Sequence, residues 1–549
     1  MLKTDLIAPV CALLRRQASE RPTRMAFRDA HSSLDYATLE RSTALLASQL
    51  QAAGLAKGES VALMLPNSVA WVQGCLATLR AGGVFVPISN DSAPPEVAYR
   101  LADADATLLV ISVDKAQQLA AVIEAAPRLR TLVLVGAGTA LSTAALSTAA
   151  PSTAAPSTDV LSGLPGHSAA GALQRLSFEA LLQDTSAAVT LPPARDPLDT
   201  QGVSFIVYTS GTTGQPKGVQ LSQHGMMWAV AACWEPVFQL SAADHLLSPL
   251  PLFHSYALNL CVLTPIALGM GVTILERYST QEVRERLRTG EYTLMPGVPT
   301  MFNYLLEAEK GQPPSRLPGM RLFYTAGAIM PAPLSQAFER QFGVPLLDGY
   351  GITETSTMVT SNWPQATRIP GSCGMPLGGL AVRLVDLEDK DVPFGEEGEL
   401  IVRGPTLMLG YRNKPQESER ALRGGWYRTG DLARADANGY LTITGRLKEL
   451  IIRGGQNIAP AEVEVAVNGF PGVVDCAVVG APHDKLGEVP VVFVVSRPGE
   501  RIDQEALLAH CRGQLSAYKV PAAVHAIDSI PRTGSGKTMR FRLTALLKS

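Results

Sequence analysis

The chain has 549 residues, with 47 Lys and Arg against 49 Asp and Glu and a formal net charge of −2. At roughly 100–200 residues per domain, this length predicts two to four structural units. Because 46% of the residues are hydrophobic and only 17% are charged, the composition excludes a disordered chain. The near-balance of charge gives no reason to expect a nucleic acid as a partner.

The seven cysteines are scattered along the chain, and no two of them form a CxxC pair. Their odd number and spacing disfavour a disulfide scaffold or a zinc ribbon and are typical of reduced thiols, so we expect a cytoplasmic protein. The eight histidines include no HxxxH pair, so a zincin-type metal site is not expected.

Two apolar stretches resemble targeting or membrane segments. Residues 6–14 are followed by two arginines where a signal peptide needs small residues, so we expect an amphipathic helix there. Residues 258–275 carry no charge, but Pro265 and Gly269 interrupt them, which favours a buried helix followed by a strand over 271–275. We therefore predict no transmembrane segment.

The first 135 residues alternate between helical and strand patterns. Strands that alternate with helices are typical of a parallel sheet with helices on its faces, so an α/β fold is expected. Apolar spacing and β-branched runs predict helices over 36–53 and 68–81 and strands over 60–65, 83–87, 106–111 and 130–135.

Residues 141–159 consist of a five-residue unit, LSTAA or PSTAA, repeated nearly four times. Five is neither a helical nor a strand period, and the small side chains bury too little area to offset the entropy of ordering. We therefore interpret 136–172 as a mobile, low-complexity insertion at the surface. A segment that docks a partner is the alternative, although such repeats usually only keep a chain solvated.

Regular alternation returns after the insertion, and its last part, 398–445, is dense in glycine, short strands and turns. This pattern predicts a small β subdomain at the end of a large domain. From Arg446 onward the strand–helix pattern starts again, and about 100 residues are enough for an independent domain. We place the boundary near Lys448, which gives an N-terminal domain over 1–447 and a C-terminal domain over 448–549.

The segment 208–219, YTSGTTGQPKGV, follows an apolar run that predicts a strand. Its hydroxyls are donors, its glycines let backbone N–H groups converge on an anion, and Lys217 adds a positive charge. These properties indicate a loop that binds phosphate; a plain Ser/Thr/Gly hairpin turn is the alternative. The Walker pattern GxxxxGK[ST] is not met here, nor at 534–538, where its first glycine would fall on Pro531.

Four further motifs follow this loop in order. Together, the five resemble the signature of the adenylate-forming superfamily, which comprises acyl-CoA synthetases, aryl-CoA ligases, luciferases and non-ribosomal adenylation domains. The resemblance covers nearly the whole chain outside 136–172, and five motifs in this order are highly specific for the superfamily. Within it, the chain most resembles the fatty acyl-CoA synthetases. The four motifs are DGYGITET at 348–355, WYRTGDL at 426–432, GRLKELI at 445–451 and PRTGSGK at 531–537.

The resemblance implies a two-step reaction. A carboxylate attacks the α-phosphate of ATP–Mg²⁺, which gives an acyl-adenylate and pyrophosphate, and a thiol, usually that of coenzyme A, then displaces AMP. It also implies a large N-terminal domain of several subdomains, with helix-flanked sheets and a small β subdomain, and a small, mobile α+β C-terminal domain.

Each matched residue has a physical reason for its implied role. Tyr350 offers an aromatic face to adenine, and Asp431 can accept both ribose hydroxyls. Thr353 is implied to donate to the α-phosphate, and Glu354 to bind Mg²⁺, a cation that keeps several waters and needs only one or two carboxylates. The other implied contacts are Thr209, Ser210, Gly211, Thr212, Thr213, Gly214 and Lys217 for the β- and γ-phosphates, Gly327, Ala328, Asp348, Gly349 and Gly351 for adenine, and Arg446 for the ribose.

Lys537 is implied for the first step, because a lysine that reaches both the attacking carboxylate and the α-phosphate neutralises charge that builds up in the transition state. It belongs to the C-terminal domain, which must therefore close over the site. Lys448 matches the family's hinge, about which that domain is thought to rotate after adenylation. Gly454 and Gly455 would then let the pantetheine arm pass close to the backbone; a simple turn is the alternative.

His254 matches the family's aromatic position beside the acyl carboxylate. Residues 251–260 contain no acid to pair an α-ammonium group, which disfavours an amino acid substrate. Residues 295–306, expected to line the acyl channel, contain no Arg or Lys to pair a second carboxylate. An apolar acid remains. The charge-free 258–275 stretch favours a medium- or long-chain fatty acid, with an aryl acid such as benzoate or cinnamate as the close alternative.

Residues 445–464 are most similar to those of CoA ligases, so CoA is the expected acceptor; a discrete acyl-carrier protein is the alternative. A luciferase-like oxygenase needs no further motif and is a third alternative. A binding protein with a degenerate site would have lost Lys537, Glu354 or the phosphate loop, and all of them are present. Asp348 departs from the family, since relatives often carry an amide there, and a carboxylate accepts hydrogen bonds but cannot donate.

Overall fold

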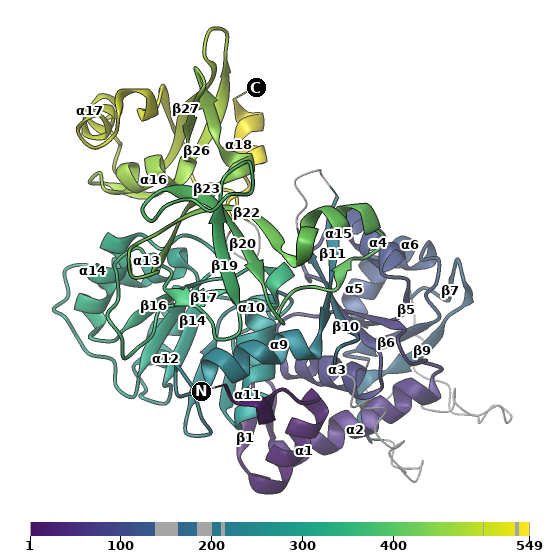
Figure 1. The fold of residues 1–549 in the computed structure, drawn as a ribbon. Coiled ribbons are helices and arrows are strands. Elements are labelled where there is room, and N and C mark those ends of the chain that lie inside the picture. The colour runs from purple at the N-terminus through teal and green to yellow at the C-terminus, as the bar shows by residue number, and fades with distance from the viewer. Residues whose placement is uncertain are drawn as a thin grey trace, which may run out of the picture.

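The structure, a computed structural model, describes residues 2–137, 163–183, 200–209, 215–497, 499–532 and 537–547. The repeat at 141–159 and the phosphate-loop residues 210–214 lie outside the described residues. Two large sheets, a small antiparallel sheet and a separate C-terminal sheet form the architecture. In Figure 1 the C-terminal part, coloured light green to yellow, lies above the two large sheets, which are side by side.

An eight-stranded sheet has the order β21-β11-β10-β4-β3-β5-β6-β9, and its strands from β10 to β9 run parallel, as predicted. Successive residues of β3 and β5 point to opposite faces, one covered by α2 and α3 and the other by α4 to α6. The strands are β3 (Ser60–Met64), β4 (Val84–Pro87), β5 (Ala106–Ser112), β6 (Thr131–Val135), β9 (Gln174–Ser177), β10 (Val203–Thr209), β11 (Lys217–Ser222) and β21 (Gly410–Tyr411). The helices are α2 (Tyr36–Ala52), α3 (Val69–Arg80), α4 (Pro94–Asp103), α5 (Val113–Gln118), α6 (Ala120–Glu124) and α8 (Phe178–Gln183).

Residues 163–172, the end of the predicted insertion, pack against this sheet. They contain the short hairpin of β7 (His167–Ser168) and β8 (Gly171–Ala172). Ser168 Oγ donates to the Leu129 carbonyl at 2.6 Å, and the flanking Leu164 and Leu173 are buried. These buried leucines and the Ser168 hydrogen bond anchor 163–172 to the domain, so the insertion ends earlier than the sequence predicted.

The second large sheet has nine strands in the order β18-β17-β16-β15-β14-β12-β13-β1-β2. The strands from β1 to β16 along this order are parallel, so their carboxyl ends share one edge, where ligands of such sheets usually bind. The strands are β1 (Met25–Arg28), β2 (Ser33–Asp35), β12 (His245–Ser248), β13 (Gly271–Ile274), β14 (Leu294–Gly297), β15 (Leu322–Thr325), β16 (Leu346–Tyr350), β17 (Thr360–Ser361) and β18 (Met375–Pro376). The helices are α1 (Val10–Glu20), α9 (Gln223–Ala229), α10 (Ser255–Ala257), α11 (Thr264–Leu268), α12 (Thr280–Leu287), α13 (Pro299–Ala308) and α14 (Ala332–Phe342).

Both ambiguous apolar stretches pack as predicted. The first contributes to α1, whose apolar side faces the core. The second forms the π-helical turn Leu258–Leu263, α11 and β13, and it is buried almost throughout. No helix in the described part of the chain is long and apolar enough to cross a bilayer.

The predicted β subdomain is the four-stranded antiparallel sheet of β19 (Ala381–Val385), β20 (Glu397–Arg403), β22 (Tyr427–Ala435) and β23 (Leu441–Arg446), so it begins before residue 398. Helix α15 (Pro415–Ala421) lies between β21 and β22 in the chain.

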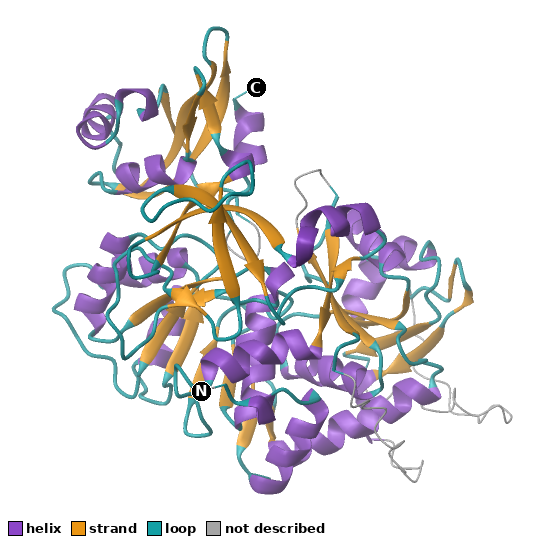
Figure 2. Cartoon of the chain, in the orientation of Figure 1, coloured by secondary structure: helices purple, strands orange, loops and turns teal. Residues whose placement is uncertain are grey.

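The C-terminal sheet has its own core, built around Val463, Val478, Val492 and Leu507. Figure 2 shows helices packed beside its strands. The fold class is therefore as predicted: a large N-terminal α/β domain and a smaller C-terminal domain. The C-terminal elements are β24 (Ile451–Arg453), β25 (Gln456–Ile458), α16 (Pro460–Asn468), β26 (Val473–His483), β27 (Gly487–Ser496), α17 (Gln504–Gln514), β28 (Ala523–Ala526) and α18 (Arg540–Leu546).

Candidate active site

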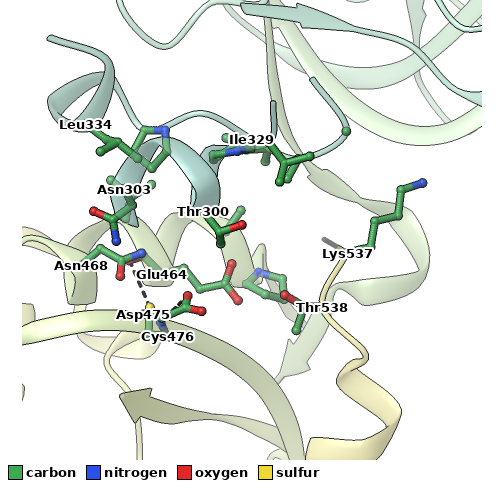
Figure 3. A pocket seen from close by; sticks show the side chains of 18 of the residues that line it. Thr300, Asn303, Ile329, Leu334, Glu464, Asn468, Asp475, Cys476, Lys537 and Thr538 are labelled. Carbon is green, nitrogen blue, oxygen red and sulfur yellow. Dashed lines mark hydrogen bonds between the residues drawn. The ribbon is translucent and has the colours of Figure 1, made fainter. Parts of the chain in front are cut away.

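A cavity of about 600 Å³ lies between the two domains. Its walls come from the carboxyl edge of the nine-stranded sheet and α13, from β22 and β23, and from α16, β26 and Lys537 of the C-terminal domain. In Figure 3, Thr300, Asn303, Ile329 and Leu334 lie on one side, Glu464, Asn468, Asp475 and Cys476 face them, and Lys537 stands at one end. The residues predicted from sequence that line it are Gly327, Ala328, Asp348, Gly349, Tyr350, Gly351, Asp431, Arg446 and Lys537.

One end of the cavity is organised around Asp431, which is 2% exposed. Tyr350 Oη donates to Asp431 Oδ2 at 2.5 Å, and Arg446 Nε lies 2.7 Å from Asp431 Oδ1. Asp431 and Arg446 are partners in the register of β22 and β23, so the backbone itself brings them together. Burial and the Asp431 charge raise the pKa of Tyr350, which stays a neutral donor. Each carboxylate oxygen can still accept a second hydrogen bond.

Gly349 and Gly351 flank Tyr350, and the protein itself leaves no room for a side chain at either. A Cβ on Gly349 would lie 1.7 Å from Tyr324 Oη, and one on Gly351 would lie 1.5 Å from the Thr357 carbonyl oxygen. Close packing inside the domain therefore requires both glycines, besides any approach to a base.

Asp348 precedes Gly349 within β16 and lines the cavity. Desolvation raises the pKa of its carboxyl group well above the ordinary value, against a backbone hydrogen bond at Gly349 that lowers it. A carboxylate here can accept a hydrogen bond from the amino group of adenine, and this role stays a prediction.

Lys537, which stands at one end of the cavity, lies close to residues of the N-terminal domain. Burial lowers the pKa of Lys537, and so does the Arg446 charge, while Glu354 and Asp431 act in the opposite direction. Burial and the Lys537 charge lower the pKa of His254 to about 3, so His254 is neutral near pH 7.

His254 Nε2 is buried and has no hydrogen-bond partner among the described residues. Ser255, the next residue, places its Oγ 3.2 Å from Thr353 Oγ1. His254 therefore lies close enough to Lys537 to be affected by its charge, and its neighbour Ser255 contacts Thr353. Neither His254 nor Thr353 is among the described residues that line the cavity.

The ends of the predicted phosphate loop are fixed by the hairpin of β10 and β11, in which Thr209 and Lys217 face each other. Lys217 pairs with Glu417, and its Nζ lies 4.8 Å from the ring centroid of Tyr411. Tyr411 Oη in turn donates to Glu354 Oε1 at 3.1 Å. The loop's Ser210, Gly211, Thr212, Thr213 and Gly214 lie outside the described residues.

The predicted hinge and CoA residues are not among those that line the cavity. Lys448 lies in the 3₁₀ turn Leu447–Glu449. Gly454 and Gly455 have φ of 58° and 82° and form the two-residue turn of the hairpin between β24 and β25. This left-handed conformation accounts for both glycines as a turn in the conformation described here.

Sequence reasoning did not find the role of α13. Asn303 Nδ2 donates to the Val474 carbonyl at 2.9 Å, and Arg497 Nε lies 3.3 Å from Glu307 Oε2, so α13 contacts the C-terminal domain. Within the predicted acyl-channel segment 295–306, Phe302 packs instead in the core against Phe323. No motif marks such contacts, because they depend on how the domains meet.

Comparison with known proteins assigns the family. The profile of AMP-binding enzymes matches residues 14–412, and that of the AMP-binding enzyme C-terminal domain matches residues 462–537. The chain belongs to the adenylate-forming superfamily. It is an AMP-forming acid–thiol ligase, as the resemblance implied.

Its relatives act on different acids. A feruloyl-CoA synthase of Amycolatopsis sp is 34% identical over 96% of both chains, and a long-chain-fatty-acid–CoA ligase of Escherichia coli O6:H1 is 33% identical over 92% of this chain and 88% of its own. ATP-bound MatB from Rhodopseudomonas palustris aligns with a TM-score of 0.82 and 28% identity, and a benzoate CoA ligase from Burkholderia xenovorans LB400 with 0.82 and 25%. Each alignment covers 98% of this chain and 99% of the solved chain.

Proposed function

We propose that this protein uses ATP to activate an apolar carboxylic acid as an acyl-adenylate and then transfers the acyl group to the thiol of CoA, releasing AMP and pyrophosphate. The observation that carries the proposal is the cavity that Lys537 of the C-terminal domain shares with Tyr350, Asp431 and Arg446 of the N-terminal domain. The Tyr350–Asp431–Arg446 cluster suits an adenosine, and the Lys537 charge also reaches His254.

In the first step, Tyr350 would stack on adenine opposite Gly327 and Ala328, and Asp431 would accept from the ribose hydroxyls. Hydrogen bonding to Asp431 fixes the Tyr350 ring before the nucleotide arrives. Asp348, which lines the cavity, would contact the edge of the base. Preorganised groups of this kind bind without the cost of rearrangement.

The residues around Glu354 fit a magnesium ion. This carboxylate lies next to the phosphate-loop hairpin through Tyr411, and Mg²⁺ prefers one or two carboxylates together with substrate phosphates and water. When bound, the ion would stabilise the negative charge of the triphosphate. Lys537 would then lie between the attacking carboxylate and the α-phosphate, with Thr353 donating to the latter.

His254 would orient the carboxylate of the substrate. Its pKa of about 3 means that it offers a hydrogen bond and no charge, and its unpartnered Nε2 is the atom free to do so. The positive charge needed to hold the acid therefore falls to Lys537.

We favour an aryl acid as the acyl substrate. The argument for a medium- or long-chain fatty acid rested on 258–275, and those residues are packed as core and do not line the cavity. Close relatives that act on ferulate and benzoate add support for an aromatic acid. A fatty acid is the second candidate, since a long-chain ligase matches the chain to nearly the same degree.

For the second step, we propose that the C-terminal domain, over 448–549, rotates about Lys448. Lys537 would leave the cavity and the turn at Gly454 and Gly455 would enter it, beside the pantetheine arm of CoA. The absence of both glycines from the cavity lining, among the described residues, is what a conformation poised for adenylation predicts. A discrete carrier protein is the alternative acceptor.

The test is pyrophosphate release from ATP–Mg²⁺ with a panel of acids, with and without CoA. The panel holds acetate, octanoate, palmitate, benzoate, cinnamate, ferulate, malonate and alanine. We expect continuous turnover that requires CoA and is fastest with an aryl acid; a maximum at palmitate would establish the second candidate. A burst that CoA cannot relieve would point to a carrier protein, and no release with any acid would refute the proposal.

A further inference from the structure

The residues on either side of Lys537 are tied to each other. Arg532 and Thr538 form an isolated antiparallel bridge, and Met539 N–H donates to the Pro531 carbonyl at 2.8 Å. The Arg532 guanidinium also donates from Nη1 to Thr538 Oγ1 at 3.0 Å. One arginine therefore holds both ends of the short segment that ends in Lys537.

The same guanidinium is anchored to the body of the C-terminal domain. Arg532 Nη2 donates to Asp475 Oδ1 at 2.7 Å and Oδ2 at 2.9 Å, and Nε lies 3.3 Å from Oδ2. Asp475 stands on β26, which pairs with β27 along most of its length, and the Arg532 and Asp475 side chains are mostly buried, with 22% and 16% exposed. A planar guanidinium that binds both oxygens of a carboxylate fixes the orientation of the two side chains as well as their distance. A lysine at this position could not do so.

The surroundings of Lys537 act on its charge in both directions. Burial and the nearby Arg446 disfavour the ammonium group, whereas Glu354, Asp431 and Glu449 favour it. The anchors on either side of Lys537 are better defined by geometry. Arg540 holds the following residues in place, through Glu449 at 2.9 Å and the Val478 carbonyl at 2.7 Å, and Asp475 holds the preceding ones through Arg532.

We propose that the Arg532–Asp475 pair, which itself lines the cavity, is a positioning device for adenylation that holds Lys537 in place. The proposal rests on the proposed function, because it concerns the first of its two steps. The second step does not use Lys537, so the pair should matter little for it. That asymmetry separates a positioning role from general support of the fold.

The experiment measures the two half-reactions of Arg532→Gln and Asp475→Asn separately. Adenylation is followed as ATP–pyrophosphate exchange with the acid that gives the fastest release in the panel, and thioester formation starts from the synthetic adenylate of that acid plus CoA. We expect exchange to fall about 10- to 100-fold, as for a displaced catalytic group, and thioester formation to stay within about twofold. Arg383→Gln, which breaks an exposed pair with Asp391 on the β subdomain, should change neither.

A double-mutant comparison completes the test. If Arg532 acts through Lys537, then Arg532→Gln should not lower exchange further once Lys537 is alanine. Arg532→Lys keeps the positive charge but loses the paired hydrogen bonds of the guanidinium. Its exchange rate should lie between those of the wild type and Arg532→Gln. The inference would be overturned if Arg532→Gln slowed both half-reactions equally. It would also be overturned if the fold losses of Arg532→Gln and Lys537→Ala multiplied in the double variant. A wild-type enzyme without exchange for any acid would refute the proposed function instead.

Discussion

The two ends of the cavity are built in different ways. At the adenosine end, Asp431 and Arg446 are register partners on β22 and β23, and Tyr350 reaches Asp431 from β16 of the nine-stranded sheet. At the catalytic end, Lys537 arrives from the C-terminal domain and is held by side-chain ion pairs. Residues on paired strands cannot move apart without breaking the backbone hydrogen bonds of the sheet. A domain held by side-chain contacts can move away from the cavity. The adenosine site is therefore formed within the N-terminal domain, whereas the catalytic step depends on the position of the C-terminal domain.

The largest effect should come from Lys537→Ala. Removing a charge aimed at the transition state costs about 10²–10³ in rate, so ATP–pyrophosphate exchange should fall by that factor. Binding of ATP, measured by calorimetry, should change by less than about threefold, because the adenosine end is intact. A loss of affinity as large as the loss of rate would show that the two ends are not separate.

Asp431→Asn should break the adenosine end. The amide removes the charge that would accept from the ribose hydroxyls, and a hydrogen bond to a charged group is worth about 2 kcal/mol. This corresponds to a rise of about 30-fold in the KM for ATP. The rate of exchange at saturating ATP should fall much less, and steady-state kinetics over a wide range of ATP distinguish the two parameters.

The pH dependence should sharpen the difference between the ends. The pKa of Lys537 is lowered by burial and by Arg446, so its ammonium form is lost as pH rises through that lowered value, before an ordinary lysine would titrate. Exchange should therefore decline, by about tenfold per pH unit beyond that pKa, on the alkaline side. Lys537→Arg, slower throughout, should lack this decline, because a guanidinium stays charged. The same alkaline decline in both enzymes would contradict this assignment.

The smallest effect should come from the junction between the domains. Asn303→Ala removes one hydrogen bond to the Val474 carbonyl, which is worth about 1 kcal/mol, or about fivefold in the population of the closed arrangement. Exchange should fall by up to that factor, while thioester formation from the synthetic adenylate should not fall. Tyr304→Ala on the same helix, at an exposed side chain, is the matched control.

Much of this fold could be predicted because local patterns carry it. Helical spacing over 36–53 and the β-branched run at 106–111 gave elements that the structure bears out within a residue or two. The contiguous motifs named Tyr350, Asp431 and Lys537, which meet in one cavity although they are far apart in the chain.

The remainder depended on contacts that no local pattern records. Asn303 and Val474 are 171 positions apart, and Asp475 and Arg532 are 57 apart, so only the packed structure joins them. Composition alone also could not place 258–275, because a charge-free run is the same for a tunnel wall and for solid core; in the structure these residues are buried and do not line the cavity.

The most direct test of the account is a single-turnover experiment with α-labelled ATP, the preferred acid and no CoA. The account predicts that one acyl-adenylate forms per enzyme molecule and stays bound in the cavity, and that CoA then converts all of it to AMP and the thioester. Formation without the acid, or AMP that appears without a preceding acyl-adenylate, would contradict the account.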